Sequence, residues 1–461
     1  MPECRRHSDC GDGMQCNGGQ CVEASGAIGE ACAREVDCGA GLACRLDNTD
    51  VDGDSFLAAT CQIDHGGGVL GAACDTDSGC RDSTCALGRC VDLCTADEDC
   101  PIGYACSSIP RVEAASGVRV PQFYGCIPER GTISWPLAIG APVDEVWLPV
   151  PGRAKSISLV MSVNDTSQRV GASSIVDPTG KTIYELPSLL EPQHTIDFYA
   201  NPLRHDIEPG LSVIQIPSTP TLPLIAGAYH LTIGSFRPNG NPASETPHAT
   251  VVAKLDTGTI LDLHFYFLGL DGHPCANALD GVTLDASSAQ SSQLFQKSYL
   301  AALRSIFGRA GVAIGNVTYD DLPSHPDLDG LDASDLGALL SLSTHEGGVN
   351  VFFVRTISPA GLLTLVGGTP GTPGIPGTAA SGVAVSLDGI CYQDWPTLAR
   401  TTAHALARHM GLYRNKEPDG HTDPIDDSDE TSANLMYFSE YGGTDLSDGQ
   451  AAVLRVNPVL R

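Results

Sequence analysis

The sequence predicts a multidomain protein in which small disulfide-rich repeats precede a β-sandwich and then an α+β domain. Three observations predict this order. Of the 18 cysteines, 16 lie before residue 127, and short β-branched runs separated by Pro, Gly and Asn come next. Strands then alternate with helices over roughly the last 200 residues. We therefore expect the three regions to span 1–128, 129–257 and 258–461.

Composition excludes several classes of protein. The chain has 461 residues, of which 42% are hydrophobic and 18% charged, and this favours about two to four folded domains over a disordered chain. Its formal net charge of −29 would repel nucleic acid phosphates, so we expect no nucleic acid partner. No apolar run approaches the roughly 18 to 20 residues of a membrane-spanning helix, so we expect no membrane span.

The cysteines of the first region form four units that begin at Cys4, Cys32, Cys74 and Cys94. No CxxC pair occurs, and zinc sites favour such close pairs together with histidine, so the spacing favours disulfides. Each unit is too small for its own core, and two bonds would replace one, in any of three pairings. The cysteines expected in disulfides are Cys4, Cys10, Cys16, Cys21, Cys32, Cys38, Cys44, Cys61, Cys74, Cys80, Cys85, Cys90, Cys94, Cys100, Cys106, Cys126, Cys275 and Cys391.

Such a disulfide framework indicates an oxidising compartment. The sequence begins MPECRRHSDC, with no apolar signal region before the first cysteine. We expect an extracellular, cell-surface or periplasmic protein whose signal peptide is not part of this sequence.

The middle region has the texture of an antiparallel β-sandwich. Its β-branched runs predict strands, and Asp177-Pro178-Thr179-Gly180 predicts a turn between two of them. The expected strands span 145–150, 156–161, 212–216 and 228–233.

The last region alternates strands at 260–267, 349–354 and 383–387 with an amphipathic helix over 295–307. A Gly/Pro-rich loop is expected at 367–377. Cys275 and Cys391 are the only cysteines here, so a bond between them is the economical expectation.

The segment Thr401-Thr402-Ala403-His404-Ala405-Leu406-Ala407-Arg408-His409-Met410-Gly411-Leu412-Tyr413-Arg414 carries the chemical signal, followed downstream by Asn434-Leu435-Met436-Tyr437. It resembles the metzincins, secreted zinc peptidases with the motif HExxHxxGxxH and a methionine turn, and the flanks resemble metzincin-like proteins of myxobacterial type. The resemblance implies a zincin-type α+β domain over about 258–461. It implies His404 as the first ligand, Gly411 as the helix bend and Met436 as the methionine turn.

The departures fall on the residues that perform catalysis in that family. Ala405 stands at the position of the glutamate base, and Arg408 and Arg414 stand at the second and third ligand positions. Arginine stays protonated and cannot donate a lone pair to a metal. His409 lies five residues after His404, about 140° around a helix, so it is a poor substitute. We therefore expect a vestigial site with no catalytic residue and no bound zinc.

The leading hypothesis is thus a secreted pseudopeptidase that binds a peptide or protein along a sheet edge, with Arg408 and Arg414 favouring an acidic group or a C-terminal carboxylate. One alternative is an active zinc peptidase that joins His404 to His421, Asp423 or Asp426. Another is an adhesion or envelope-spacer protein that works through its repeats and sandwich.

We expect no cofactor, unless zinc binds to non-standard ligands. A weaker signal for calcium comes from one segment. Asn48-x-Asp50-x-Asp52-Gly53 resembles the start of an EF-hand loop, although Ala59 replaces its closing glutamate.

Overall fold

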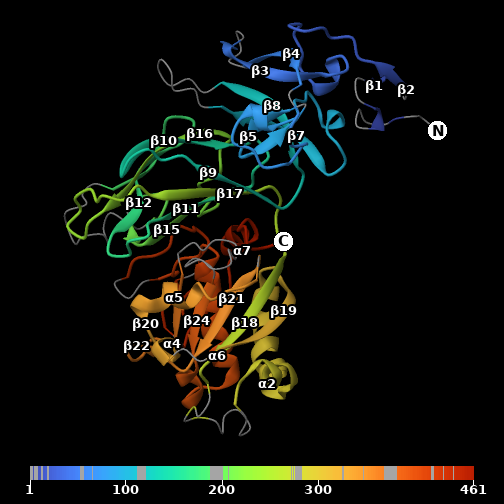
Figure 1. The fold of residues 1–461 in the computed structure, drawn as a ribbon. Helices are drawn as coiled ribbons and strands as arrows, with labels where there is room; N and C mark the ends of the chain where they lie inside the picture. Colours follow the sequence, from blue (N-terminus) through green and yellow to red (C-terminus); the bar gives the residue numbers. More distant parts are fainter. Residues whose placement is uncertain are drawn as a thin grey trace.

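In the computed structural model the three regions lie end to end, with the cysteine units at one end and the C-terminal domain at the other (Figure 1). The C-terminus lies where the sandwich meets the last domain. No helix among the described residues is long and apolar enough to cross a membrane. The structure describes residues 4, 9–11, 14–17, 20–51, 57–64, 66–81, 83–111, 121–186, 201–205, 207–270, 273, 275, 283–323, 326–345, 347–367, 382–416, 420–428, 430–439 and 441–461.

Seven disulfides join described cysteines of the cysteine-rich region, as expected. In the last three units the first cysteine bonds the third and the second bonds the fourth, which decides among the three pairings that the sequence left open. In the first unit Cys10 bonds Cys21, again joining second to fourth. The bonds of the last three units are Cys32–Cys44, Cys38–Cys61, Cys74–Cys85, Cys80–Cys90, Cys94–Cys106 and Cys100–Cys126.

Each unit ends in an antiparallel hairpin whose two strands carry its third and fourth cysteines directly opposite each other. The hairpin strands are β1 (Met14–Asn17) with β2 (Gln20–Glu23), β3 (Leu42–Val51) with β4 (Leu57–Ile63), β5 (Thr84–Ala86) with β6 (Arg89–Val91), and β7 (Tyr104–Pro110) with β8 (Gln122–Pro128). Single 3-10 turns precede the last three hairpins, namely η2 (Glu35–Asp37), η3 (Asp77–Gly79) and η4 (Asp97–Asp99).

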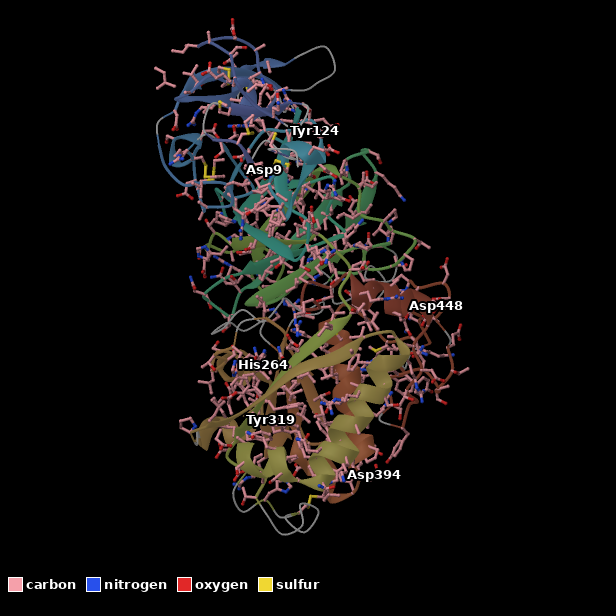
Figure 2. The ribbon with its side chains drawn as sticks, turned by 90° about the vertical axis from the view of Figure 1, so that its right-hand side faces the viewer. Asp9, Tyr124, His264, Tyr319, Asp394 and Asp448 are labelled. Carbon is pink, nitrogen blue, oxygen red and sulfur yellow. A yellow bond between two sulfur atoms is a disulfide. The ribbon has the colours of Figure 1, made fainter. Side chains whose placement is uncertain are left out.

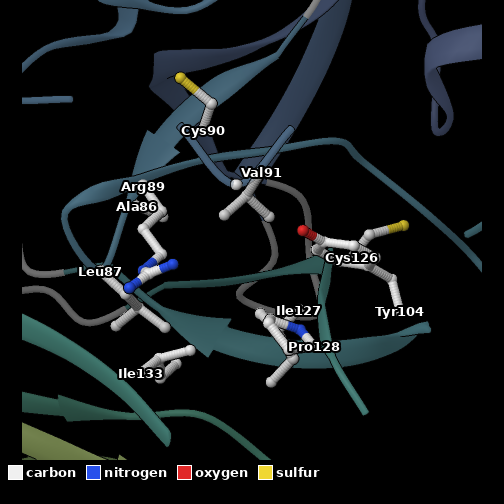
Figure 3. A pocket seen from close by; sticks show the side chains of 11 residues that line it. Ala86, Leu87, Arg89, Cys90, Val91, Tyr104, Cys126, Ile127, Pro128 and Ile133 are labelled. Carbon is white, nitrogen blue, oxygen red and sulfur yellow. The ribbon is translucent and has the colours of Figure 1, made fainter. Parts of the chain in front are cut away.

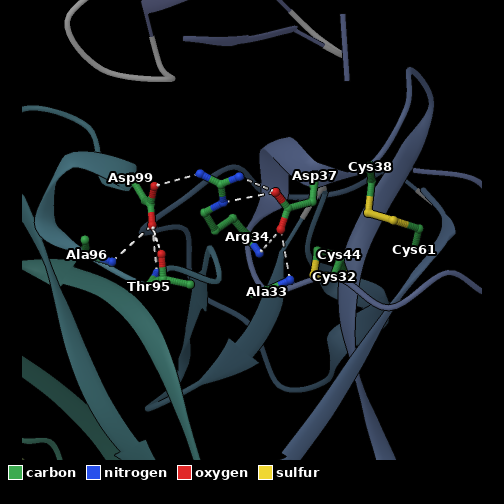
Figure 4. Close-up of polar contacts among 10 residues, drawn as sticks. All are labelled: Cys32, Ala33, Arg34, Asp37, Cys38, Cys44, Cys61, Thr95, Ala96 and Asp99. Atoms are coloured by element: carbon green, nitrogen blue, oxygen red, sulfur yellow. Dashed lines mark hydrogen bonds and ion pairs between the residues drawn. A yellow bond between two sulfur atoms is a disulfide. The ribbon is translucent and has the colours of Figure 1, made fainter. Parts of the chain in front are cut away.

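The aspartate before the second cysteine organises the start of a unit. Asp37 accepts a hydrogen bond from the backbone N–H of Arg34 at 2.9 Å, and Asp99 accepts one from that of Thr95 at 2.8 Å. The guanidinium of Arg34 forms ion pairs with both carboxylates, at 2.6 Å to Asp37 and 3.6 Å to Asp99 (Figure 4). One side chain therefore links the second unit to the fourth.

A second arginine links the second unit to the third. Arg45 is only 5% exposed and donates to the carbonyl oxygens of Asp77 at 2.8 Å and Cys80 at 3.0 Å. Buried carbonyl groups need such donors, and a guanidinium can satisfy two at once. The units are therefore held together by polar contacts as well as by their disulfides.

The third unit is anchored to the sandwich by the tip of its hairpin. Leu87 has a φ of 53° and is buried, and Gly88 follows with a φ of 69°. A Cβ at Gly88 would lie 3.1 Å from the Cβ of Trp135, a tight contact, and the positive φ also favours glycine here. Leu87 and Ile133 line a small apolar hollow beneath the hairpin (Figure 3).

One hydrophobic cluster runs from the cysteine units into the sandwich. It contains Leu46 of the second unit, Leu87 of the third and Phe123 of the fourth, together with Trp135 and Leu159 of the sandwich. A shared hydrophobic core therefore crosses the boundary expected after residue 128, and the cysteine units pack against the sandwich.

The middle region is a sandwich of two antiparallel sheets, and all four expected strands and the turn at 177–180 are present. Alternate residues such as Val146, Leu148 and Val150 point into the core between the sheets. One sheet has the order β10 (Val143–Val150), β16 (Gly227–Phe236), β12 (Arg169–Val176) and β13 (Thr182–Glu185), with β14 (Glu208–Pro209) paired to β12. The other has the order β15 (Leu211–Ile216), β11 (Ser156–Ser162), β17 (His248–Lys254) and β9 (Thr132–Leu137).

The C-terminal domain is built on a five-stranded mixed sheet. Its order is β19 (Ala313–Leu322), β18 (Ile260–Leu268), β21 (Val349–Val354), β24 (Gly382–Ser386) and β23 (Thr364–Val366). The first four strands are parallel, and β23 pairs antiparallel with β24 at the edge. The three expected strands are present, although the last ends at Ser386, while most of the expected loop at 367–377 lies outside the described residues.

Both faces of this sheet are covered, which suits its largely parallel strands. Leu263 and Phe265 pack with α3 (Ala301–Arg309) and α6 (Trp395–His409) on one face. Tyr266 and Phe352 pack with α5 (Leu336–Leu340) on the other. The helix expected at 295–307 comprises a π-helical segment, Leu294–Leu300, continued by α3. The remaining elements are α2 (Ala286–Ser291), α4 (Pro326–Asp329), β20 (Gly330–Asp332), η7 (Ala333–Asp335), β22 (Thr356–Ser358), η8 (Leu387–Cys391) and α7 (Asp448–Arg455).

Buried polar contacts join the sandwich to the C-terminal domain. Lys254 is 1% exposed, and its Nζ donates to the carbonyl oxygen of Leu460 at 2.5 Å and pairs with Asp256 at 2.9 Å. The Nδ2 of Asn457 donates to the Oε1 of Gln215 at 2.6 Å. Because both contacts lie away from water, losing one partner would leave a buried polar group unsatisfied.

Candidate functional site

Helix α6 carries the residues that the sequence singles out. Asp394 caps it by accepting from the backbone N–H of Thr397 at 2.9 Å, and a proline at the second position suits a helix start. Figure 2 shows Asp394 at the end of the molecule away from the cysteine units. The helix ends at His409, and Gly411, two residues later, lies beside Gln215 of the sandwich.

Three residues of one helix face meet at the site. Arg400, His404 and Arg408 are spaced i, i+4 and i+8, which places them above one another along α6. His404 is half-buried. Arg400 is 5% exposed and donates to the carbonyl oxygens of Leu435 at 2.8 Å and Tyr437 at 3.1 Å.

The turn at 434–437 is held against this face. The Nδ1 of His404 lies 2.9 Å from the carbonyl oxygen of Leu435. A carbonyl oxygen only accepts, so Nδ1 is the donor and carries the proton. Within the turn, the side chain of Asn434 accepts from the backbone N–H of Met436 at 2.8 Å, and Met436 is fully buried. Met436, the residue predicted for the methionine turn, directly follows Leu435, and Leu435 is the residue that binds His404.

The site is electropositive. The pKa of His404 is lowered to about 3, first by burial and then by the positive charges of Arg408, Arg400 and Arg414, against the opposing effect of the Leu435 carbonyl. The imidazole is therefore neutral at any physiological pH, with its lone pair on Nε2. Arg408 and Arg414 are both part-buried, and the structure brings them within electrostatic range of His404.

The position to which the metzincin resemblance assigns a general base lies in the core. Ala405 is 1% exposed and belongs to the cluster between α6 and the sheet. It offers no group that could move a proton. His409 is fully buried as well, on a different side of the helix from His404, as its five-residue spacing predicts.

Gly411 ends the helical segment as a bend, with a φ of 102° that favours glycine. A Cβ at this position would lie 3.2 Å from the side-chain atoms of Gln215 in the sandwich. Tyr413 follows and donates from its hydroxyl to the carbonyl oxygen of Arg204 at 2.7 Å. The sandwich thus packs directly against the bend, which the sequence did not indicate.

The alternative ligands do not gather around His404. His421 and Asp426 are exposed, while Asp423 is buried near Gln450, 3.5 Å away. Burial raises the pKa of Asp423 to about 6. Across the part of the chain that the structure describes, no group of three potential metal ligands includes His404.

The close groups of potential ligands that do occur are built on cysteines engaged in disulfides. One contains His273 with Cys275 and Cys391, and these two cysteines form the bond that the sequence led us to expect. Only part of the EF-hand-like segment lies among the described residues. Asn48 and Asp50 belong to strand β3, whereas Asp52 and Gly53 lie outside the described residues.

Strand β23 forms an edge of the sheet and packs against α6. Among the described strands it pairs only with β24, so its other side faces away from the sheet. An edge strand presents unpaired backbone groups that can pair with an extended peptide.

Sequence reasoning missed two features. The first is Arg400, although its four-residue spacing from His404 was a usable signal. The second is a polar cluster in which His264 stacks on His345 with ring centroids 4.4 Å apart, with Asp320 2.8 Å from His345 and Thr318 2.9 Å from His264 (Figure 2 labels His264). No spacing in the sequence relates these residues, because β18, β19 and the loop before β21 bring them together.

Comparison with known proteins does not assign the chain to a family. No protein-family model matches the chain, and no curated protein matches it. Among solved structures, the siderophore-interacting protein SipS from Aeromonas hydrophila aligns with a TM-score of 0.10 and 11% identity, over 50% of this chain and 81% of that one. A TM-score this low supports no statement about fold or function.

Proposed function

We propose that the protein is an exported, metzincin-like pseudopeptidase whose former catalytic site binds a peptide instead of cleaving it. The observation that carries the proposal is the charge of the site: one neutral histidine lies among the cations of Arg400, Arg408 and Arg414. A divalent metal would be repelled by these charges and would find only one imidazole. The disulfides support export to an oxidising compartment.

Three further features support peptide binding without hydrolysis. Ala405 supplies no general base to activate water. The edge strand β23 packs beside α6 and can accept an extended chain by backbone pairing. The arginines favour an anionic group on that chain.

Metal analysis tests the loss of the metal site. The full-length protein, dialysed against zinc and then against buffer, should retain no stoichiometric zinc and should not cleave fluorescent casein. The double variant Arg408→His/Arg414→His should gain about one zinc, because three imidazoles then surround the site. The matched variant Arg408→Gln/Arg414→Gln removes the same charges without adding ligands and should gain none.

One zinc per native chain with chelator-sensitive cleavage would overturn the proposal in favour of the peptidase with non-standard ligands. The double variant leaves Ala405 unchanged. This position is buried, so a glutamate there would lower the free energy of unfolding.

A second candidate, a rigid surface spacer, is favoured by the core shared between the cysteine units and the sandwich. Small-angle scattering of the full chain should then fit a single rigid body. Replacing Arg34 and Arg45 by alanine should broaden the distance distribution, because these side chains link the units. An unchanged distribution would contradict that role.

A further inference from the structure

The disulfide of the C-terminal domain is more accessible than those of the cysteine units. Cys391 is exposed, whereas the other cysteines whose exposure the structure describes are buried or half-buried. Its half-buried partner Cys275 follows β18, and Cys391 is the last residue of η8. A thiolate exchanges only with a disulfide sulfur that it can reach. Thiol–disulfide exchange should therefore begin at Cys391.

A buried histidine lies beside both sulfurs. His273 is 3% exposed, and one of its ring nitrogens and the Sγ atoms of Cys275 and Cys391 all lie within 4.8 Å of one another. The ligands of a tetrahedral zinc ion, with bonds of about 2.0–2.3 Å, are roughly 3.3–3.8 Å apart. Once the sulfurs are reduced, small side-chain rotations bring two thiolates and one imidazole to that spacing.

The hydrogen bond of His273 sets the tautomer that such a site requires. Nδ1 accepts from the backbone N–H of Cys275 at 3.2 Å, so it carries the lone pair of the neutral ring and faces Cys275. The proton is then on Nε2, which lies 3.7 Å from Oδ1 of Asp388. Metal-binding histidines commonly direct their second N–H toward a carboxylate, which orients the ring. The arrangement around His273 is thus the one expected of a ligand that binds through Nδ1.

The charges around the three side chains suit a zinc ion held by two thiolates. The thiolates neutralise Zn²⁺, and Asp388 and Arg355 act on His273 with opposite charges. The net charge of −29 also favours cations over anions near the surface of the chain.

This cluster is separate from the site around His404. Cys391 lies three residues before Asp394, which marks the end of the molecule away from the cysteine units (Figure 2). Ten residues of α6 separate Asp394 from His404, and at 1.5 Å per residue this is about 15 Å.

We propose that the Cys275–Cys391 disulfide is a reducible metal site, in which His273, Cys275 and Cys391 bind one zinc ion after reduction by a dithiol. A thiolate of the reductant attacks the Sγ of Cys391, the S–S bond breaks, and its electron pair passes to the Sγ of Cys275. The second thiol of the reductant then displaces Cys391, and the reductant leaves as a cyclic disulfide. Zinc binds the two thiolates, and two protons pass to the solvent. This inference does not depend on peptide binding.

The first measurement identifies the bond that opens. The full-length protein is treated without denaturant at rising concentrations of dithiothreitol, and free thiols are alkylated with iodoacetamide and located by mass spectrometry. Cys275 and Cys391 should be labelled at a lower concentration than any cysteine of the disulfide units. Earlier labelling of another pair, or resistance of this one, would overturn the proposal.

The second measurement is the zinc content. Reduced protein that is freed of dithiothreitol, equilibrated with zinc sulfate and dialysed against zinc-free buffer should retain one zinc per chain, and oxidised protein treated in the same way should retain none. Bound zinc should also block alkylation of Cys275 and Cys391. Reduced protein that exposes both thiols and retains no zinc contradicts the proposal. Because this arm uses the native chain, it does not depend on the folding of a variant.

Variants assign the ligands. His273→Gln should bind zinc more than about tenfold more weakly, because loss of even an outer hydrogen bond to a zinc ligand costs affinity on that scale. His248→Gln changes an exposed histidine of β17 and should bind zinc as the native chain does. Equal affinities in these two variants would remove His273 from the ligand set. Cys275→Ser/Cys391→Ser should retain no zinc, and one zinc in that variant would place the metal at a different disulfide.

Discussion

The Nδ1 of His404 donates a hydrogen bond to the carbonyl oxygen of Leu435 at 2.9 Å, so a helix residue and a turn residue 31 positions apart are fixed to each other. This bond sets the tautomer of the ring and holds the turn of Met436 beneath it. It also leaves Nε2 as an acceptor, which is the state that both a metal and a ligand N–H would require. The turn therefore fixes both the orientation and the tautomer of a histidine that lies within range of the charges of Arg400, Arg408 and Arg414.

Replacing His404 should cost stability as well as binding. His404→Gln removes the bond to Leu435 at a part-buried position, and we expect a loss of about 1 kcal/mol in the free energy of unfolding. Urea denaturation measures it. The control His248→Gln changes an exposed histidine of β17 and should shift the midpoint little. Equal shifts in both variants would show that the His404 bond contributes nothing.

Alanine substitution at two glycines with similar φ angles distinguishes the cost of backbone strain from the cost of a steric contact. Gly411 has a φ of 102° and Gly420 a φ of 95°, so alanine is strained at both, by about 1–2 kcal/mol. Only at Gly411 would the new Cβ lie 3.2 Å from Gln215, whereas nothing lies within 4 Å at Gly420. Thermal unfolding should therefore show a larger loss for Gly411→Ala. A loss as large for Gly420→Ala would argue against tight packing of the bend on the sandwich.

The contact of Lys254 should couple the unfolding of two regions. Lys254→Met leaves the Leu460 carbonyl and Asp256 without their buried cation, and breaking such a pair costs about 3 kcal/mol. Calorimetry should show a single transition in the native chain and two transitions in the variant. Lys155→Met alters an exposed lysine close by and should keep one transition. Two transitions in the native chain would show that the regions are not coupled.

Acid should destabilise the protein through its buried histidines. The pKa of His205 is lowered by burial to about 3, as is that of His404, against 6.5 in an exposed ring. Between these values the unfolded chain binds more protons, so their contribution is complete above pH 6.5 and is lost as the pH falls toward 3. Asp423, with its pKa raised from 3.8 to about 6, acts in the opposite direction within that window.

The variant His205→Gln isolates one of these groups. Its free energy of unfolding should rise less steeply with pH than that of the native chain, by about 1.4 kcal/mol per pH unit between pH 4 and 6. Urea midpoints across this range measure the two slopes. Parallel slopes would mean that His205 is protonated in the folded protein.

Much of the architecture could be predicted from local pattern. The β-branched runs at 145–150 and 156–161 predicted strands, and the amphipathic spacing of Phe295 and Tyr299 predicted a helix. Disulfide pairing could not be predicted, because all three pairings of four cysteines fit the same spacing. The core that the cysteine units share with the sandwich could not be predicted either. It includes Leu87 at a hairpin tip, and a positive φ is uncommon for leucine.

The candidate site was predictable where it lies on one helix. The relative placement of His404, Ala405 and Arg408 follows from helical spacing within α6. The partners from elsewhere were not predictable: Leu435 and Gln215 reach the site through tertiary packing that leaves no mark on sequence spacing. The residues on the helix could therefore be identified from the sequence, and their partners from other elements could not.

The bond between Cys275 and Cys391 spans 116 positions and encloses most of the parallel sheet together with the edge strand β23. A protease in the surrounding medium that cut once inside this span would leave both fragments covalently attached. Such a nicked molecule would run as intact protein on a gel without reductant and as two bands with it. A single cut within this span therefore releases neither half of the molecule until the bond is reduced.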